Sequence, residues 1–192
     1  INPGSDGSLS SFRATLTNVD GTLFFAANNG TTGNELWKSD GTEAGTTLVR
    51  DIRSGGNSSY LGNLTNLGGT LFFTAFDGTN GRELWKSDGT EAGTVQVADI
   101  NSGALGSQPG NLTNVDGTLF FAANDGTNGH ELWKSDGTEA GTSLVADINP
   151  GSDGSLFFSV ALTNVDGTLF FAADDGTHGR ELWKSDGTEA GT

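Results

Sequence analysis

Short apolar segments alternate with glycine-rich turns along the whole chain. The first group of such segments covers Leu16 to Val19, Thr22 to Ala27, Glu35 to Lys38 and Thr47 to Ile52, and Asp20-Gly21 separates the first two. An Asp-Gly pair between two such segments is a strong signal for a tight hairpin turn. No segment keeps a 3.6-residue apolar period over ten positions, so the pattern predicts four short strands and no helix.

The apolar residues occupy both faces of these expected strands. Leu23 and Phe25 point to one side and Phe24 to the other, because side chains alternate along a strand. Leu132 and Trp133 fall on opposite faces in the same way. A sheet with one wet face would show apolar residues on one side only, so we expect each small sheet to be covered on both sides.

The same group of segments recurs at a fixed period. The sequence ELWKSDGTEAGT occurs four times without change, and its copies begin at Glu35, Glu83, Glu131 and Glu181, in steps of 48, 48 and 50 residues. Four-stranded units of about 40–50 residues that pack between copies of themselves are typical of β-propeller blades. A β-solenoid is the rival interpretation, although its coils are usually shorter.

We therefore predict an all-β protein with a β-propeller fold. A single repeat domain over residues 1–192 would hold four antiparallel blades, at about 1–52, 53–100, 101–148 and 149–192. Ile1 aligns with Ile52, Ile100 and Ile148, and Thr192 precedes the position of a further strand, so the last blade would lack its outer strand. The exposed edge that results would belong to a slice of a longer array, to a blade completed by another chain, or to a plain sequence boundary.

Composition and charge exclude several partners. The formal net charge is −15, which disfavours nucleic acid and anionic membrane surfaces because both require clustered Lys and Arg. No apolar run approaches the roughly 20 residues of a membrane span, so we expect no membrane insertion. The chain has no Cys, which excludes disulfides and thiolate metal sites.

The repeated motif also supports a resemblance. ELWKSDGTEAGT, followed by LVADINPGSDGS at 144–155, resembles the bacterial ELWxxDGT-repeat proteins over nearly the whole chain. The resemblance implies a bacterial protein that is secreted or exposed at the cell surface, with many repeats and a propeller-like fold. It implies no defined catalytic activity.

One face of such a propeller would carry polar loops from the middle of each blade and from the connections between blades. The oxygen-bearing residues expected there are Asp125, Asp147, Asn149, Asp153 and Asp175. Calcium takes its ligands from carboxylates, Asn and backbone carbonyls in flexible loops, so these residues are candidate calcium ligands. The alternative is that they form Asx-turns beside glycine. No other cofactor is expected.

Aromatic residues suggest two further roles. The motif places one tryptophan in each unit, at Trp37, Trp85, Trp133 and Trp183, and we interpret these four as packing residues between blades, with sugar stacking as the alternative. Phe12, Tyr60 and Phe157 lie in the variable connections between units. They are candidates for a ligand-binding face, or for lids over the blade ends.

The sequence gives no support for a catalytic site. It contains no G-x-S-x-G motif, and near-identical units argue against an active site, which normally breaks the symmetry. We therefore expect a non-enzymatic extracellular module that serves as a structural scaffold, in adhesion or in self-assembly, with neighbouring repeats or other copies as partners. The alternative is a lectin that binds carbohydrate at several weak sites, with or without calcium. An enzyme is the third hypothesis.

Overall fold

The computed structural model describes residue 9 and residues 16–156 and 160–192, and the described part is all-β without a helix. A helix able to cross a membrane is accordingly not found among these residues. The strands are β1 (Thr17–Val19), β2 (Thr22–Asn28), β3 (Asn34–Ser39), β4 (Thr47–Arg50), β5 (Gly62–Leu67), β6 (Thr70–Phe76), β7 (Arg82–Ser87), β8 (Val95–Ala98), β9 (Gly110–Val115), β10 (Thr118–Asn124), β11 (His130–Ser135), β12 (Ser143–Ala146), β13 (Thr163–Val165), β14 (Thr168–Asp174) and β15 (Arg180–Ser185).

The strands form four antiparallel sheets in which neighbours in the chain are neighbours in space. Three sheets have four strands each, β1 to β4, β5 to β8 and β9 to β12, and the last has three, β13 to β15. The first hairpin closes with Val19 opposite Thr22. Its two turn residues, Asp20 and Gly21, have φ angles of 48° and 85°, which is the left-handed geometry that a two-residue hairpin requires.

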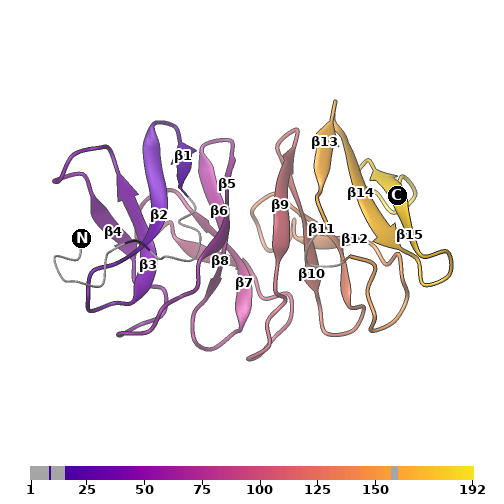
Figure 1. Cartoon of the computed structure of the whole chain (residues 1–192), viewed down its shortest axis with the longest axis horizontal. Helices are drawn as coiled ribbons and strands as arrows, with labels where there is room; N and C mark the ends of the chain where they lie inside the picture. The colour runs from indigo at the N-terminus through magenta and orange to yellow at the C-terminus, as the bar shows by residue number, and fades with distance from the viewer. Residues whose placement is uncertain (1–8, 10–15, 157–159) are drawn as a thin grey trace.

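The four sheets follow one another like consecutive blades of a propeller. Figure 1 shows them side by side in chain order, with the first and the last at opposite ends of the molecule. The first strands of successive sheets contact one another, β1 with β5, β5 with β9 and β9 with β13. The predicted fold class, an all-β propeller whose last blade has only three strands, is confirmed, and the described residues show no closed ring.

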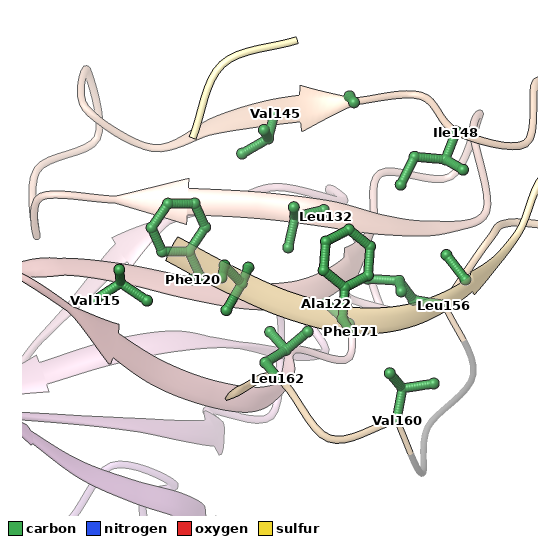
Figure 2. Packing of buried hydrophobic residues seen from close by; sticks show 13 residues of the cluster. Val115, Phe120, Ala122, Leu132, Val145, Ile148, Leu156, Val160, Leu162 and Phe171 are labelled. Carbon is green, nitrogen blue, oxygen red and sulfur yellow. The ribbon is translucent and has the colours of Figure 1, made fainter. Parts of the chain in front are cut away.

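The hydrophobic core lies between the sheets. Phe24 and Leu36 of the first sheet pack in one cluster with Phe73 and Trp85 of the second. Figure 2 shows the equivalent cluster between the third and fourth sheets, where Leu132 and Phe171 belong to the same group. Burial of each such Leu or Phe side chain stabilises the folded state by about 1.5–3 kcal/mol. Both faces of the inner sheets are therefore covered, as the sequence pattern predicts.

Candidate functional site

Two equivalent grooves lie one repeat apart, where the loop between the second and third strands of a sheet meets a connection between sheets. The first has a volume of about 360 Å³ and includes Asn101, Gly106, Asn124, Gly126, Thr127 and Gly129 in its lining. The second, of about 570 Å³, is lined by the matching residues Asn149, Gly154, Asp174, Gly176, Thr177 and Gly179, together with Asp153. The repeat therefore builds the same kind of polar groove twice.

A buried glutamate holds the connection that forms one wall of each groove. Glu131 is fully buried on β11, and its carboxylate accepts hydrogen bonds from the backbone N–H of Ile148 at 3.1 Å and of Ser155 at 2.7 Å, and from the Ser155 hydroxyl. Glu83 on β7 accepts the matching bonds from Ile100, at 3.4 Å, and from Ser107, whose N–H lies at 2.6 Å. Each glutamate thus fixes both ends of a connection.

Burial changes the protonation of these glutamates. Loss of solvent raises the pKa of Glu83 to about 7, against the opposing effect of the hydrogen bonds from Ser107 and Ile100. The pKa of Glu35 is raised to about 7, and that of Glu131 is raised as well, also mainly by burial. Because all three side chains are fully buried, we assign them the role of positioning the loops and not of contacting a ligand.

The other wall of the first groove is the loop between β10 and β11, and this loop packs closely against the connection between β12 and β13. A Cβ atom on Gly129 would lie 2.4 Å from the backbone nitrogen of Gly154, so any larger residue would push the loop and the connection apart. The connection itself is braced by Asn149, whose side-chain amide donates to the carbonyl oxygen of Gly154 at 3.1 Å. Asn101 makes the same bond to Gly106 at 3.2 Å.

The structure brings together only part of the predicted calcium set. Asn149 and Asp153 line the second groove, where the second carboxylate is that of Asp174 and not of Asp175. Asp147 is exposed and lies outside the lining of both grooves. Within residues 16–156 and 160–192, no group of three or more His, Cys, Asp or Glu residues could hold a metal. A calcium site at these positions stays a prediction.

Asp125 and Asp175 form the Asx-turns that were the alternative interpretation. The Asp125 carboxylate accepts from the backbone N–H groups of Thr127 and Asn128, both at 2.8 Å. Asp175 makes the equivalent bonds and also contacts Nδ1 of His178 at 2.7 Å. The bond to His178 is the main reason why the pKa of Asp175 falls to about 2. These carboxylates are therefore engaged in shaping their own loops.

Of the three candidate ligand-binding aromatics, the structure describes Tyr60. Tyr60 is 57% exposed, and the guanidinium of Arg53 lies 5.9 Å from its ring centroid. Phe12 and Phe157 lie outside the described residues. The exposed ring of Tyr60 is compatible with either of the roles considered for it, as a binding aromatic or as a lid.

Three of the four tryptophans face a neighbouring sheet, whereas Trp37 packs against residues of its own sheet. Trp85 is buried in the cluster that joins the first two sheets, and Trp37 is buried beside Phe25. Trp133 and Trp183 are partly buried against the corresponding clusters. Trp85, Trp133 and Trp183 thus lie between sheets, and Trp37 does not.

Sequence reasoning missed the buried glutamates. A glutamate at the start of an exposed-looking motif reads as a solvated residue, yet Glu35, Glu83 and Glu131 are fully buried. A usable signal was present, because a serine follows each of Glu83 and Glu131 by 24 residues. A constant spacing between a carboxylate and a hydroxyl in repeated units indicates a polar contact inside the repeat.

Comparison with known proteins yields similarity of fold only. No family model and no curated protein matches the chain. A solved structure of puromycin hydrolase is similar with a TM-score of 0.59 and 14% identity, over 91% of this chain and 27% of that one. A variant of the same enzyme complexed with PGG gives a TM-score of 0.57 at 15% identity, over 86% and 25% of the two chains. An α-L-arabinofuranosidase, CtGH43 from Clostridium thermocellum, gives 0.42 at 15% identity, over 95% and 72%.

These findings correct the functional expectation. The two similar structures with TM-scores above 0.5 are of a hydrolase, which contradicts the expected non-enzymatic module for scaffolding, adhesion or self-assembly, and its lectin alternative. The chain spans about a quarter of the length of puromycin hydrolase, 25% and 27% in the two structures. The symmetry argument considered only near-identical units, whereas the structures of similar fold belong to a hydrolase.

Proposed function

We propose that this chain is the part of a propeller-based hydrolase that holds the substrate, and that the two grooves bind a hydroxyl-rich, uncharged ligand such as an oligosaccharide. The observation that carries the proposal is the recurrence of one polar groove in two consecutive units. Hydrolases with a similar fold support the enzymatic context.

The chemistry of the lining favours hydroxyl groups. The groove residues are amides, threonines, glycines, two carboxylates, one serine and the exposed Leu105, and no Lys or Arg is among them. Amide and carboxylate oxygens accept from sugar hydroxyls, while amide N–H groups donate to them. The volumes, about 360 and 570 Å³, fall in the range of small-molecule sites. The resemblance of the motif to secreted repeat proteins supports an extracellular location as part of the same proposal.

Two exposed aspartates on one connection allow a matched test. Asp153 lines the second groove, whereas Asp147 lies six positions earlier in the sequence and outside the lining. We would titrate the chain with arabino- and xylo-oligosaccharides and follow the backbone amide signals of Gly154 and Gly176 by NMR. Saturable shifts are expected, and Asp153→Ala should weaken them about tenfold, the effect of losing one hydrogen bond to a charged group. Asp147→Ala should bind like the parent chain.

Two results would overturn the proposal. One is the absence of saturable shifts at millimolar oligosaccharide. The other is equal weakening by Asp153→Ala and Asp147→Ala, because general loss of negative charge would then explain the effect.

A further inference from the structure

The connection between the first two sheets differs from the next connection at the positions that line a groove. The lining of the first groove includes three amide side chains, those of Asn101, Gln108 and Asn124. One repeat step of 48 residues earlier, the same positions hold Arg53, Tyr60 and Phe76. Three amides are thus replaced together by one guanidinium and two aromatic rings.

The backbone follows the same course in both connections. Tyr60 and Gln108 have φ angles of 51° and 50°. The backbone N–H of Phe76 donates to the carbonyl oxygen of Ser59 at 2.8 Å, and Asn124 makes the matching bond in the next connection at 2.9 Å. The exchanged side chains therefore start from equivalent places, and the difference between the two connections lies in their chemistry.

Bracing of the connection does not require an arginine. Arg53 donates from Nη1 to the carbonyl oxygen of Ser58 at 3.3 Å, and Asn101 makes the equivalent bond to Gly106 with a shorter side chain. The longer side chain of Arg53 also places its guanidinium 4.6 Å from the ring centroid of Phe76 and 5.9 Å from that of Tyr60. A guanidinium within about 6 Å of a ring centroid is attracted to the ring face. Arg53 therefore joins the two rings in one aromatic cluster.

We propose that this aromatic cluster of Arg53, Tyr60 and Phe76 is a subsite that binds one sugar ring by stacking against Tyr60. The inference rests on the proposed function and extends it from the two polar grooves to the equivalent position of the preceding connection. Phe76 is half-buried, whereas Tyr60 is 57% exposed, so Tyr60 is the ring that a ligand can reach.

The chemistry of the cluster suits a sugar ring. The C–H face of a sugar is apolar and packs against an aromatic ring, while the Tyr60 hydroxyl and the N–H groups of a guanidinium donate to sugar hydroxyls. A nucleobase would also stack on tyrosine, but the formal net charge of −15 disfavours nucleic acid. The subsite thus offers a flat apolar surface and hydrogen-bond donors, where the two grooves offer amides and carboxylates.

Tyr60 is the only tyrosine in the sequence, so a label on tyrosine reports on this subsite alone. The complete 192-residue chain is labelled with fluorotyrosine and titrated with arabino- and xylo-oligosaccharides, and its single fluorine NMR signal is followed. A saturable shift is expected with the oligosaccharides. Sorbitol at the same concentration of hydroxyl groups should give none, because an open-chain polyol has no ring face to stack.

Two variants test the part of Arg53. Arg53→Asn introduces the side chain that braces the next connection and removes the guanidinium, so the chain should fold, which circular dichroism checks. Binding at Tyr60 should weaken about fivefold, the effect expected for the loss of one exposed cation beside an aromatic ring. Lys184→Gln removes an equal charge from an exposed residue of the last sheet, and should leave the titration unchanged.

The backbone amide signals of Gly154 and Gly176, followed in the same titration, separate this inference from the proposed function. Shifts at both glycines without a shift at Tyr60 would overturn the subsite and leave the grooves as binding sites. A shift at Tyr60 alone would support the subsite and overturn the grooves, and no shift at any of the three would overturn both. An equal response to sorbitol, or equal weakening by Arg53→Asn and Lys184→Gln, would also overturn the subsite.

Discussion

Lys38 donates from its Nζ to the carbonyl oxygen of Gly89, 2.8 Å away, and so ties the first sheet to the turn after β7 in the second sheet. The same bond recurs between Lys86 and Gly137 at 2.8 Å, and between Lys134 and Gly187 at 2.7 Å. The motif ELWKSDGT thus contains both partners of this bond. Its lysine donates to the next unit, and its glycine carbonyl accepts from the lysine of the previous unit. The same bond therefore links each described pair of consecutive sheets.

Removing one of these lysines should loosen two neighbouring sheets. Lys86→Met keeps most of the aliphatic side chain but leaves the buried Gly137 without its bond from Nζ. We expect a loss of about 1–2 kcal/mol in the free energy of unfolding, measured by urea denaturation. Lys184→Met is the matched control, because Lys184 is exposed on the last sheet, and its effect should stay within about 0.5 kcal/mol. Equal losses would show that the bond does not stabilise the contact.

Replacing the leucine of the motif by alanine should destabilise the protein far more where the leucine is buried than where it is exposed. Leu132 is fully buried between the third and fourth sheets, so Leu132→Ala should cost about 2–5 kcal/mol through lost contacts and a cavity. Leu182 is 78% exposed, so Leu182→Ala should cost less than about 0.5 kcal/mol. Thermal or urea unfolding of both variants tests the pair. A large loss in Leu182→Ala would mean that this side chain is covered in solution.

The strands could be predicted from the sequence because their signals are local. Asp20-Gly21 sets a hairpin turn by its own backbone preferences, and Phe24 and Phe25 show by alternation that both faces are buried. The expected segment Glu35 to Lys38 corresponds to β3 (Asn34–Ser39), one residue longer at each end. Such features depend on residues close together in the chain, and the same local signals occur in each of the four repeats.

The grooves could not be predicted because they depend on contacts between distant segments. A glutamate in a polar motif is expected to be solvated, and only the folded structure shows that Ser155 donates to the buried carboxylate of Glu131. Asp125 and Asp175 are candidates for calcium ligands or for Asx-turns from the sequence, and only the fold shows that their carboxylates accept hydrogen bonds from their own loops. A sequence gives the type of each side chain, whereas the direction in which a carboxylate points is set by the fold.

The close backbone approach at the first groove should make one glycine far less replaceable than its repeat counterpart. Gly129 and Gly179 have φ angles of 69° and 76°, so alanine is strained at both and should cost about 1–2 kcal/mol. A Cβ on Gly129 would also lie 2.4 Å from the backbone of Gly154, whereas one on Gly179 meets nothing within 4 Å. Gly129→Ala should therefore cost more than about 3 kcal/mol. Equal losses in urea denaturation would contradict the tight contact.

The buried glutamates should make stability fall as the pH rises through the weakly acidic range. Burial raises the pKa of Glu83 from 4.5 to about 7, so between these values the folded chain keeps a proton that the unfolded chain has released. The folded state then binds more protons, and the free energy of unfolding decreases with rising pH. The contribution of Glu83 is most favourable below pH 4.5, declines towards pH 7 and is constant above it.

Glu83→Gln removes this titration and keeps the size of the side chain. The free energy of unfolding of the parent chain, relative to that of the variant, should therefore decrease by about 1–3 kcal/mol between pH 4.5 and 7. Each unit of pKa difference corresponds to about 1.4 kcal/mol. Urea denaturation at several pH values measures the difference. Glu91→Gln, at an exposed turn position, is the control for removal of one carboxylate away from the buried site. A difference for Glu83→Gln that is flat or that grows with pH would show that Glu83 is ionised in the folded chain.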